Sequence, residues 1–143
     1  MPKSDGNRGA RGRVSLPIFP TIESRACQIW QILVGHAMRR QTLTYQDLAH
    51  LLGHNQPKVL YRQLGAIYFY CKQNDLPLLT GLVVNKATGE PGSGFEPDAE
   101  RGRLRERVYN YNWYGIVPPT LEEYREARVE AGARDDGDRN EEQ

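Results

Sequence analysis

The sequence lacks several features that mark common classes of protein. It has only two cysteines in 143 residues, Cys27 and Cys71, and each lies in a helical pattern among apolar neighbours. Two such cysteines do not make a disulfide framework, so we interpret them as buried free thiols. There is no signal peptide and no apolar run near the ~18 residues that a membrane span needs. We therefore expect a cytoplasmic protein without a membrane partner.

The sequence also lacks the common motifs of catalysis and metal binding. It contains no Gly-x-Ser-x-Gly motif, no P-loop and no dinucleotide-binding fingerprint. His50 and His54 are four residues apart, but Gly53 ends the helix between them, and no carboxylate or thiol joins them at ligand spacing. We predict that the chain is not an enzyme and binds no metal or cofactor.

What the sequence does have is an uneven distribution of charge. The net charge is +1, yet residues 121–143 hold four arginines against nine acidic residues, whereas residues 1–120 hold 15 basic against nine acidic residues. A basic body attracts polyanions such as nucleic acids, although an ordinary solvated surface would also account for it. An acidic tail could screen such a body.

Length and composition predict one folded domain with two unfolded ends. Residues 1–20 form a flexible basic arm, residues 21–131 a folded domain, and residues 132–143 a disordered charged tail. Within the domain we expect the following: a helix over 24–40, capped by Ser24 or alternatively opened by Thr21; helices over 45–52 and 57–73; a buried strand in "LPLLTGLVVN"; a wing-like loop in "NKATGEPGSGF"; and a last helix capped by Thr120.

The central segment has the pattern of a helix-turn-helix. Thr44 is placed to cap the second helix, Gly53 to end it, and Pro57 to open the third helix. A helix, a short helix, a turn and a longer helix make up that motif. The predicted fold class is α+β, mostly α: a winged helix-turn-helix domain.

The predicted recognition helix concentrates Lys58, Tyr61, Arg62 and Gln63 in its N-terminal half. In a helix-turn-helix that half enters the major groove, where such side chains meet base edges or phosphates. The alternative interpretation is a solvated helix face.

Three further residues complete the predicted DNA-binding set. Thr44 and Tyr45 stand at a helix N-terminus, which favours a phosphate. Lys86 could reach the DNA backbone from the wing.

A later segment carries aromatic residues: Tyr109, Tyr111, Trp113 and Tyr114. Their alternation is typical of a strand, and the other interpretation is that they pack the tail onto the core.

Three stretches support a resemblance to a known family. "TYQDLAHLLG" at 44–53 matches closely, "RQLG" at 62–65 matches fairly, and "LTGLVV" at 79–84 keeps only its final Val-Val. Over roughly residues 24–95 the chain resembles the C-terminal domain of the O6-alkylguanine-DNA alkyltransferases and the alkyltransferase-like proteins.

The resemblance implies roles for single residues. Tyr45 would contact the phosphate of the target nucleotide, and Arg62 would enter the base stack. Thr80 stands where the family has its alkyl-accepting cysteine, and Gly81 where it has a histidine, so alkyl transfer is expected to be absent.

We therefore predict a non-catalytic protein that binds double-stranded DNA through its recognition helix and phosphate contacts. Two alternatives stay open. One is a recogniser of alkylated bases that recruits repair, and the other is a protein-interaction module of a defence or phage system.

Overall fold

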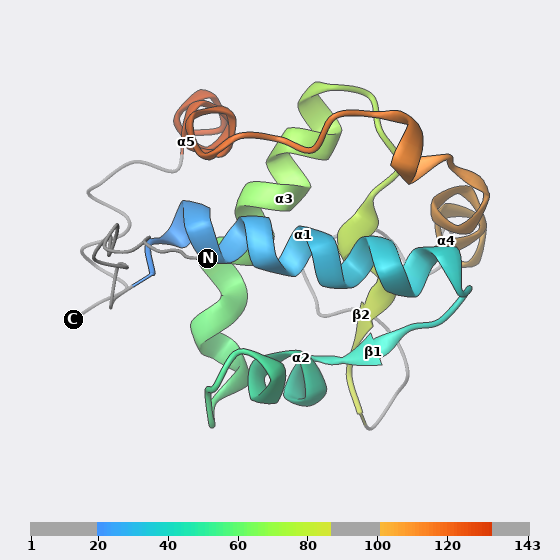
Figure 1. Ribbon diagram of the computed structural model, residues 1–143, viewed down its shortest axis with the longest axis horizontal. Helices are drawn as coiled ribbons and strands as arrows, with labels where there is room; N and C mark the ends of the chain where they lie inside the picture. Colours follow the sequence, from blue (N-terminus) through green and yellow to red (C-terminus); the bar gives the residue numbers. More distant parts are fainter. Residues whose placement is uncertain (1–19, 87–100, 133–143) are drawn as a thin grey trace, which may run out of the picture.

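The computed structural model describes residues 20–86 and 101–132 (Figure 1). The predicted basic arm, most of the predicted wing loop and the acidic tail lie outside the described residues. The described part of the chain is mostly helical with one small sheet, as predicted for the fold class. Its elements are α1 Ile22–Met38, β1 Leu43–Thr44, α2 Tyr45–Leu51, the 3-10 helix η1 Pro57–Leu60, α3 Tyr61–Gln73, the 3-10 helix η2 Leu79–Leu82, β2 Val83–Val84, α4 Arg101–Asn110, the 3-10 helix η4 Trp113–Gly115 and α5 Leu121–Glu130.

Helix α1 crosses the middle of the molecule, with α2 below it and α3, α5 and α4 around it (Figure 1). It begins where Thr21 and Ser24 cap each other: Thr21 Oγ1 accepts from the Ser24 amide at 3.0 Å, and Ser24 Oγ accepts from the Thr21 amide at 2.9 Å. The alternative start at Thr21 is thus confirmed, and the predicted bounds of 24–40 lie two residues late at each end. The apolar stripe is buried as predicted: Ala26, Ile29, Trp30, Leu33, Val34 and Ala37.

The second helix has the predicted cap, because Thr44 Oγ1 accepts from the Asp47 amide at 2.9 Å. Gly53 follows it with φ +84, a left-handed conformation that glycine adopts without a Cβ penalty. The prediction of one continuous helix over 57–73 is wrong in its first turn. Residues Pro57–Leu60 form a 3-10 turn, in which the Val59 amide donates to the Gln56 carbonyl, and the α-helix starts at Tyr61.

The predicted strand in "LPLLTGLVVN" is mostly not a strand. Only Val83–Val84 is extended, and it pairs in parallel with Leu43–Thr44, while Leu79–Leu82 forms a 3-10 turn. The stretch is nonetheless core, since Leu79, Leu82 and Val83 are fully buried. An apolar run in a sequence indicates that the segment is buried, but it does not show whether the segment is a strand or a turn.

The aromatic segment after α4 is not a strand either. Tyr109 lies in the last turn of helix α4, and η4 begins at Trp113. Trp113 is buried, its ring centroid lies 5.6 Å from that of Trp30, and its Nε1 donates to the Val108 carbonyl at 2.8 Å. The packing interpretation is therefore confirmed for Trp113, whereas Tyr114 is 71% exposed.

Helix α5 has the predicted cap in full. Thr120 Oγ1 accepts from the Glu123 amide, and Glu123 Oε1 accepts from the Thr120 amide. The two cysteines, Cys27 and Cys71, are both free thiols, as predicted. Cys71 is buried, and this burial raises its thiol pKa from 9.0 to about 12. Cys27 is only half-buried, so the prediction of a buried thiol is confirmed for Cys71 alone, and partial burial likewise raises the pKa of Cys27.

Candidate functional site

A pocket of about 410 Å³ opens at the start of α3 and is lined by Lys58, Val59, Tyr61 and Arg62. These residues come from η1 and from the first turn of α3. Residues three and four apart on a helix face the same way, so Lys58, Tyr61 and Arg62 share one side. The chain thus places two cationic side chains and a phenol around one hollow.

The opposite side of the same segment anchors it in the core. Leu60 and Leu64 are essentially fully buried, whereas Tyr61 is 62% exposed and Val59 is 42% exposed. Because the leucines fix the rotation of the helix, the pocket residues must face outward. Val59 was not predicted as a site residue, although its position directly before an inward-facing leucine could have indicated it.

Helix α2 contacts the pocket residue Tyr61 through the ring of Tyr45. Tyr45 is only 7% exposed, and its ring stands edge-on to the Tyr61 ring with centroids 6.2 Å apart. Such edge-to-face pairs favour one ring orientation. The structure therefore places Tyr45 as a support for Tyr61 rather than as an exposed phosphate contact.

Three other predicted site residues are not among those lining the pocket. The Thr44 hydroxyl caps α2. The Gln63 amide, oriented so that its nitrogen donates, bonds to the carbonyls of Val59 at 2.8 Å and Leu60 at 3.2 Å. Lys86 is exposed and follows β2. Of the seven predicted residues, the pocket brings together Lys58, Tyr61 and Arg62.

The chemistry of the lining favours an anion. A guanidinium can donate two parallel hydrogen bonds to a phosphoryl or carboxylate group, and an ammonium acts as a compact point charge beside it. The Tyr61 hydroxyl can donate a further hydrogen bond. No carboxylate belongs to the described residues that line this pocket.

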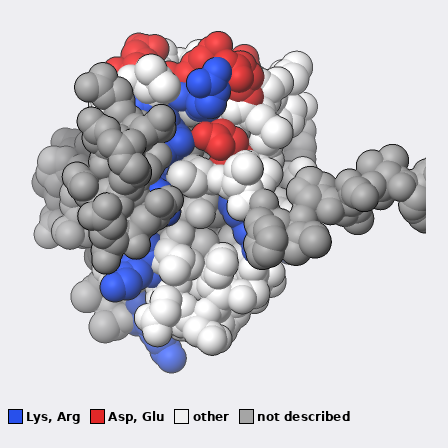
Figure 2. Space-filling view, turned by 90° about the vertical axis from the view of Figure 1, so that its left-hand side faces the viewer, with Lys and Arg blue, Asp and Glu red and all other residues white. Residues whose placement is uncertain are grey.

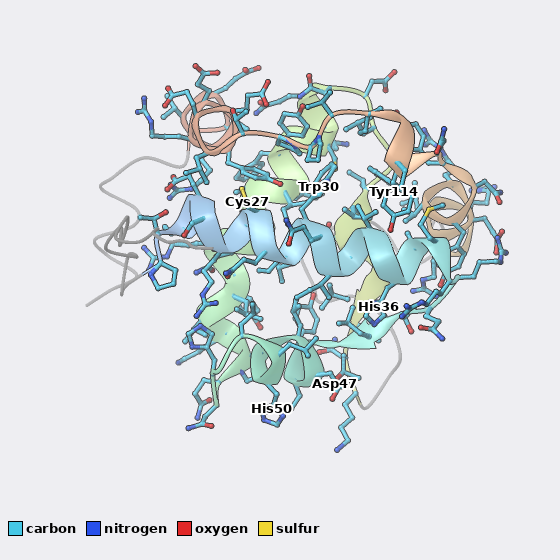
Figure 3. All side chains as sticks on the ribbon, viewed as in Figure 1. Cys27, Trp30, His36, Asp47, His50 and Tyr114 are labelled. Carbon is cyan, nitrogen blue, oxygen red and sulfur yellow. The ribbon has the colours of Figure 1, made fainter. Side chains whose placement is uncertain are left out.

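A second hollow of about 430 Å³ lies between the end of α1 and α2, and two of its six lining residues are His36 and His50. His36 Nδ1 lies 3.0 Å from the Ile32 carbonyl oxygen, and His50 Nε2 lies 2.7 Å from Gln46 Nε2. Figure 3 shows the His50 ring pointing away from the fold. Within residues 20–86 and 101–132, no group of three His, Cys, Asp or Glu side chains could hold a metal ion.

Comparison with known proteins finds a partial sequence similarity. Over 80 residues the chain is 34% identical to the chloroplastic soluble inorganic pyrophosphatase 1 of Chlamydomonas reinhardtii. The match covers 55% of this chain, and the chain spans only 28% of the length of that relative. No family model matches the chain, and no solved structure matches it.

This likeness corrects the functional prediction. The relative is by its name an enzyme that acts on inorganic pyrophosphate and not a DNA-binding protein, so the prediction that DNA binding is the function of this chain is wrong. The buried ring of Tyr45, the capping role of Thr44 and the inward-bonded amide of Gln63 offer a physical reason, because these groups already serve the fold.

These observations do not test several other predictions. The resemblance to the alkyltransferases, the absence of enzymatic activity, and double-stranded DNA or a protein as partner all stay predictions. So does the cytoplasmic location. In the described part of the chain, no helix combines the length and apolarity needed to traverse a bilayer.

Proposed function

We propose that the chain binds inorganic pyrophosphate, or a small anion with the same phosphoryl groups, in the pocket of Lys58, Val59, Tyr61 and Arg62. The observation that carries the proposal is the pair of cationic side chains, four residues apart, on the rim of one pocket. The name of the partial relative supplies the candidate ligand.

The pocket suits a compact ligand with several negative charges. Arg62 can take one phosphoryl group through paired N–H donors, and Lys58, one turn earlier, can take the other. Tyr61, held by Tyr45, would form a wall with a hydroxyl donor. Hydrogen bonds to a charged partner contribute about 1.5–3 kcal/mol each, so the two cations dominate the expected affinity.

We also propose that the fold is a winged helix-turn-helix. The order α2, turn, η1 and α3 supports this, as does the short sheet before the segment where the wing is predicted. In this arrangement the anion pocket occupies the start of the helix that such domains commonly use for recognition.

Isothermal titration calorimetry of the full chain with sodium pyrophosphate tests the proposal. Arg62→Ala should weaken binding about 10- to 150-fold, the equivalent of about 1.5–3 kcal/mol. Arg125→Ala is the matched control, since it removes the same charge from an exposed pair on α5. It should leave the affinity within about twofold.

Two results would refute the proposal: no heat with pyrophosphate in the unmodified chain, or equal affinities for Arg62→Ala and Arg125→Ala. A phosphate-release assay with Mg²⁺, run on the same samples, measures hydrolysis separately. Release that Arg62→Ala abolishes would make the pocket part of an enzyme and would refute the prediction that the chain is not one.

A further inference from the structure

The strongest remaining feature is a separation of charge along one edge of the molecule. Figure 2 looks at that edge: acidic side chains gather at the top, where α5 lies, and the surface below is mostly uncharged with basic side chains beside it. The acidic residues of α5 are Glu122, Glu123, Glu126 and Glu130. The cations of the pocket lie at the other end of α3 from its contact with α5 through Gln73.

Two side-chain contacts bring the end of α5 and the end of α2 to this same edge. Arg128, in the last turn of α5, pairs with Glu23 in the first turn of α1 at 3.0 Å. Arg25, in that same turn of α1, donates to the Leu52 carbonyl at the end of α2 at 3.0 Å. A helical turn rises only about 5.4 Å, so α1 bridges the two helix ends closely. The turn after Leu52 leads directly to Lys58.

The chain continues beyond α5 with the segment 133–143, which carries five acidic and two basic residues. An extended segment of eleven residues spans up to about 36 Å at ~3.3 Å per residue. That reach is long compared with the single turn of α1 that separates the ends of α5 and α2. The carboxylates of α5 repel it, whereas Lys58 and Arg62 attract it.

We propose that residues 133–143 dock on the pocket of Lys58, Tyr61 and Arg62 and compete there with anionic ligands. The inference shares a site with the proposed function but does not need pyrophosphate to bind. A tethered segment has an effective concentration of about millimolar. A tail with a millimolar dissociation constant would therefore cover the pocket about half of the time and weaken anion binding about twofold.

Paramagnetic relaxation enhancement in the full chain tests the docking directly. A nitroxide label is attached at Asn140→Cys in a Cys27→Ser background, in which the remaining native thiol, Cys71, is buried. The backbone amides of residues 58–62 should lose most of their intensity at low salt. They should recover it in about 1 M NaCl, where the screening length falls to about 3 Å.

Two matched controls carry the same label. In the first, the five acidic residues of the tail are changed to their amides. In the second, Lys58→Ala and Arg62→Ala are combined. Both should abolish the signal loss at residues 58–62. Loss that persists in either control, loss confined to residues 1–19, or no loss anywhere would overturn the proposal, and the second of these results would mean that the tail pairs with the basic arm.

The outcome is separable from that of the proposed function. If the label reports docking but calorimetry detects no pyrophosphate, the tail inference stands and the proposed ligand fails. If pyrophosphate binds equally tightly with the native and the neutralised tail and the label reports no docking, the ligand stands and the tail inference fails.

Discussion

Removing one partner of the ion pair between Glu23 and Arg128 should destabilise the fold more than removing one partner of an exposed pair, because the charge left behind is largely buried. The two side chains are 18% and 9% exposed, and their charged atoms are 3.0 Å apart. On the same helix, Arg125 pairs with Glu122 at 2.7 Å, but both of those side chains are more than half exposed. The two pairs differ in their access to water and in their span, since Arg125 and Glu122 are neighbours on one helix whereas Arg128 and Glu23 join α5 to α1.

We expect Arg128→Met to lower the free energy of unfolding by about 2–3 kcal/mol. Removing one partner of a buried pair costs about 3–5 kcal/mol, because the other charge is left without compensation. Glu23 keeps some exposure and lies in the first turn of α1, where the helix dipole favours a carboxylate by about 0.3–1 kcal/mol, so the lower end applies. Arg125→Met should cost less than about 1 kcal/mol.

Urea unfolding followed by the fluorescence of Trp30 and Trp113 measures both changes. Methionine keeps the aliphatic volume of arginine, so the difference reports the charge. Glu23→Gln combined with Arg128→Met should recover part of the loss, since no unpaired charge remains. Equal losses for Arg128→Met and Arg125→Met would refute the reasoning.

Three further predictions concern local features of the fold. Thr120→Ala should lower the stability by about 1 kcal/mol in the same urea assay, because α5 loses its capping hydroxyl. Gly115→Ala should cost less than about 1 kcal/mol, because the atom 2.5 Å from the new Cβ is Nδ2 at the end of the exposed Asn112 side chain, which can rotate away, and the same change combined with Asn112→Ala should cost no more. The pKa of Cys71 is raised to about 12 in the fold, so the unfolded chain loses this proton first and stability should fall as the pH rises above 9. Relative to Cys71→Ala, the loss should reach about 2 kcal/mol by pH 10.5, and parallel pH profiles of the two proteins would contradict this.

Features set by neighbours in the chain were predictable from the sequence. The caps at Thr44 and Thr120 depend on residues three positions away, and both are present as expected. The stripe of α1 follows from its helical period. The start of α1 was ambiguous because Thr21 and Ser24 are both good capping residues, and in the structure each caps the other.

Features set by distant contacts were not predictable in the same way. Helix α4 has only a short apolar face in its sequence: Val108 is buried, Leu104 packs beside it, and the exposed Glu106 accepts from Arg40 at 2.8 Å. Arg40 also lies over the ring of Tyr109 at 4.8 Å. No local pattern encodes a partner some seventy residues away.

In the candidate site too, some features follow from spacing in the sequence and others from contacts between distant segments. The spacing of Lys58, Tyr61 and Arg62 places them together on any helical segment, so the sequence was sufficient for that part. Whether Tyr45 faces solvent depends on the packing of α2 against the start of α3, which the sequence does not display. Its burial is what turns a predicted contact residue into a support for Tyr61.

The central position of α1 has a consequence for how the protein is made. This helix is synthesised before α3 and α5, yet its apolar stripe is covered by α3 and by α5, which ends only at Glu130. At about 5–20 residues per second, the stripe waits roughly 5–20 s for its last cover. During that interval the nascent chain presents Trp30 and Leu33 to any chaperone or neighbouring chain. Synthesis rate, rather than the stability of the finished fold, would then govern how much of the protein escapes aggregation.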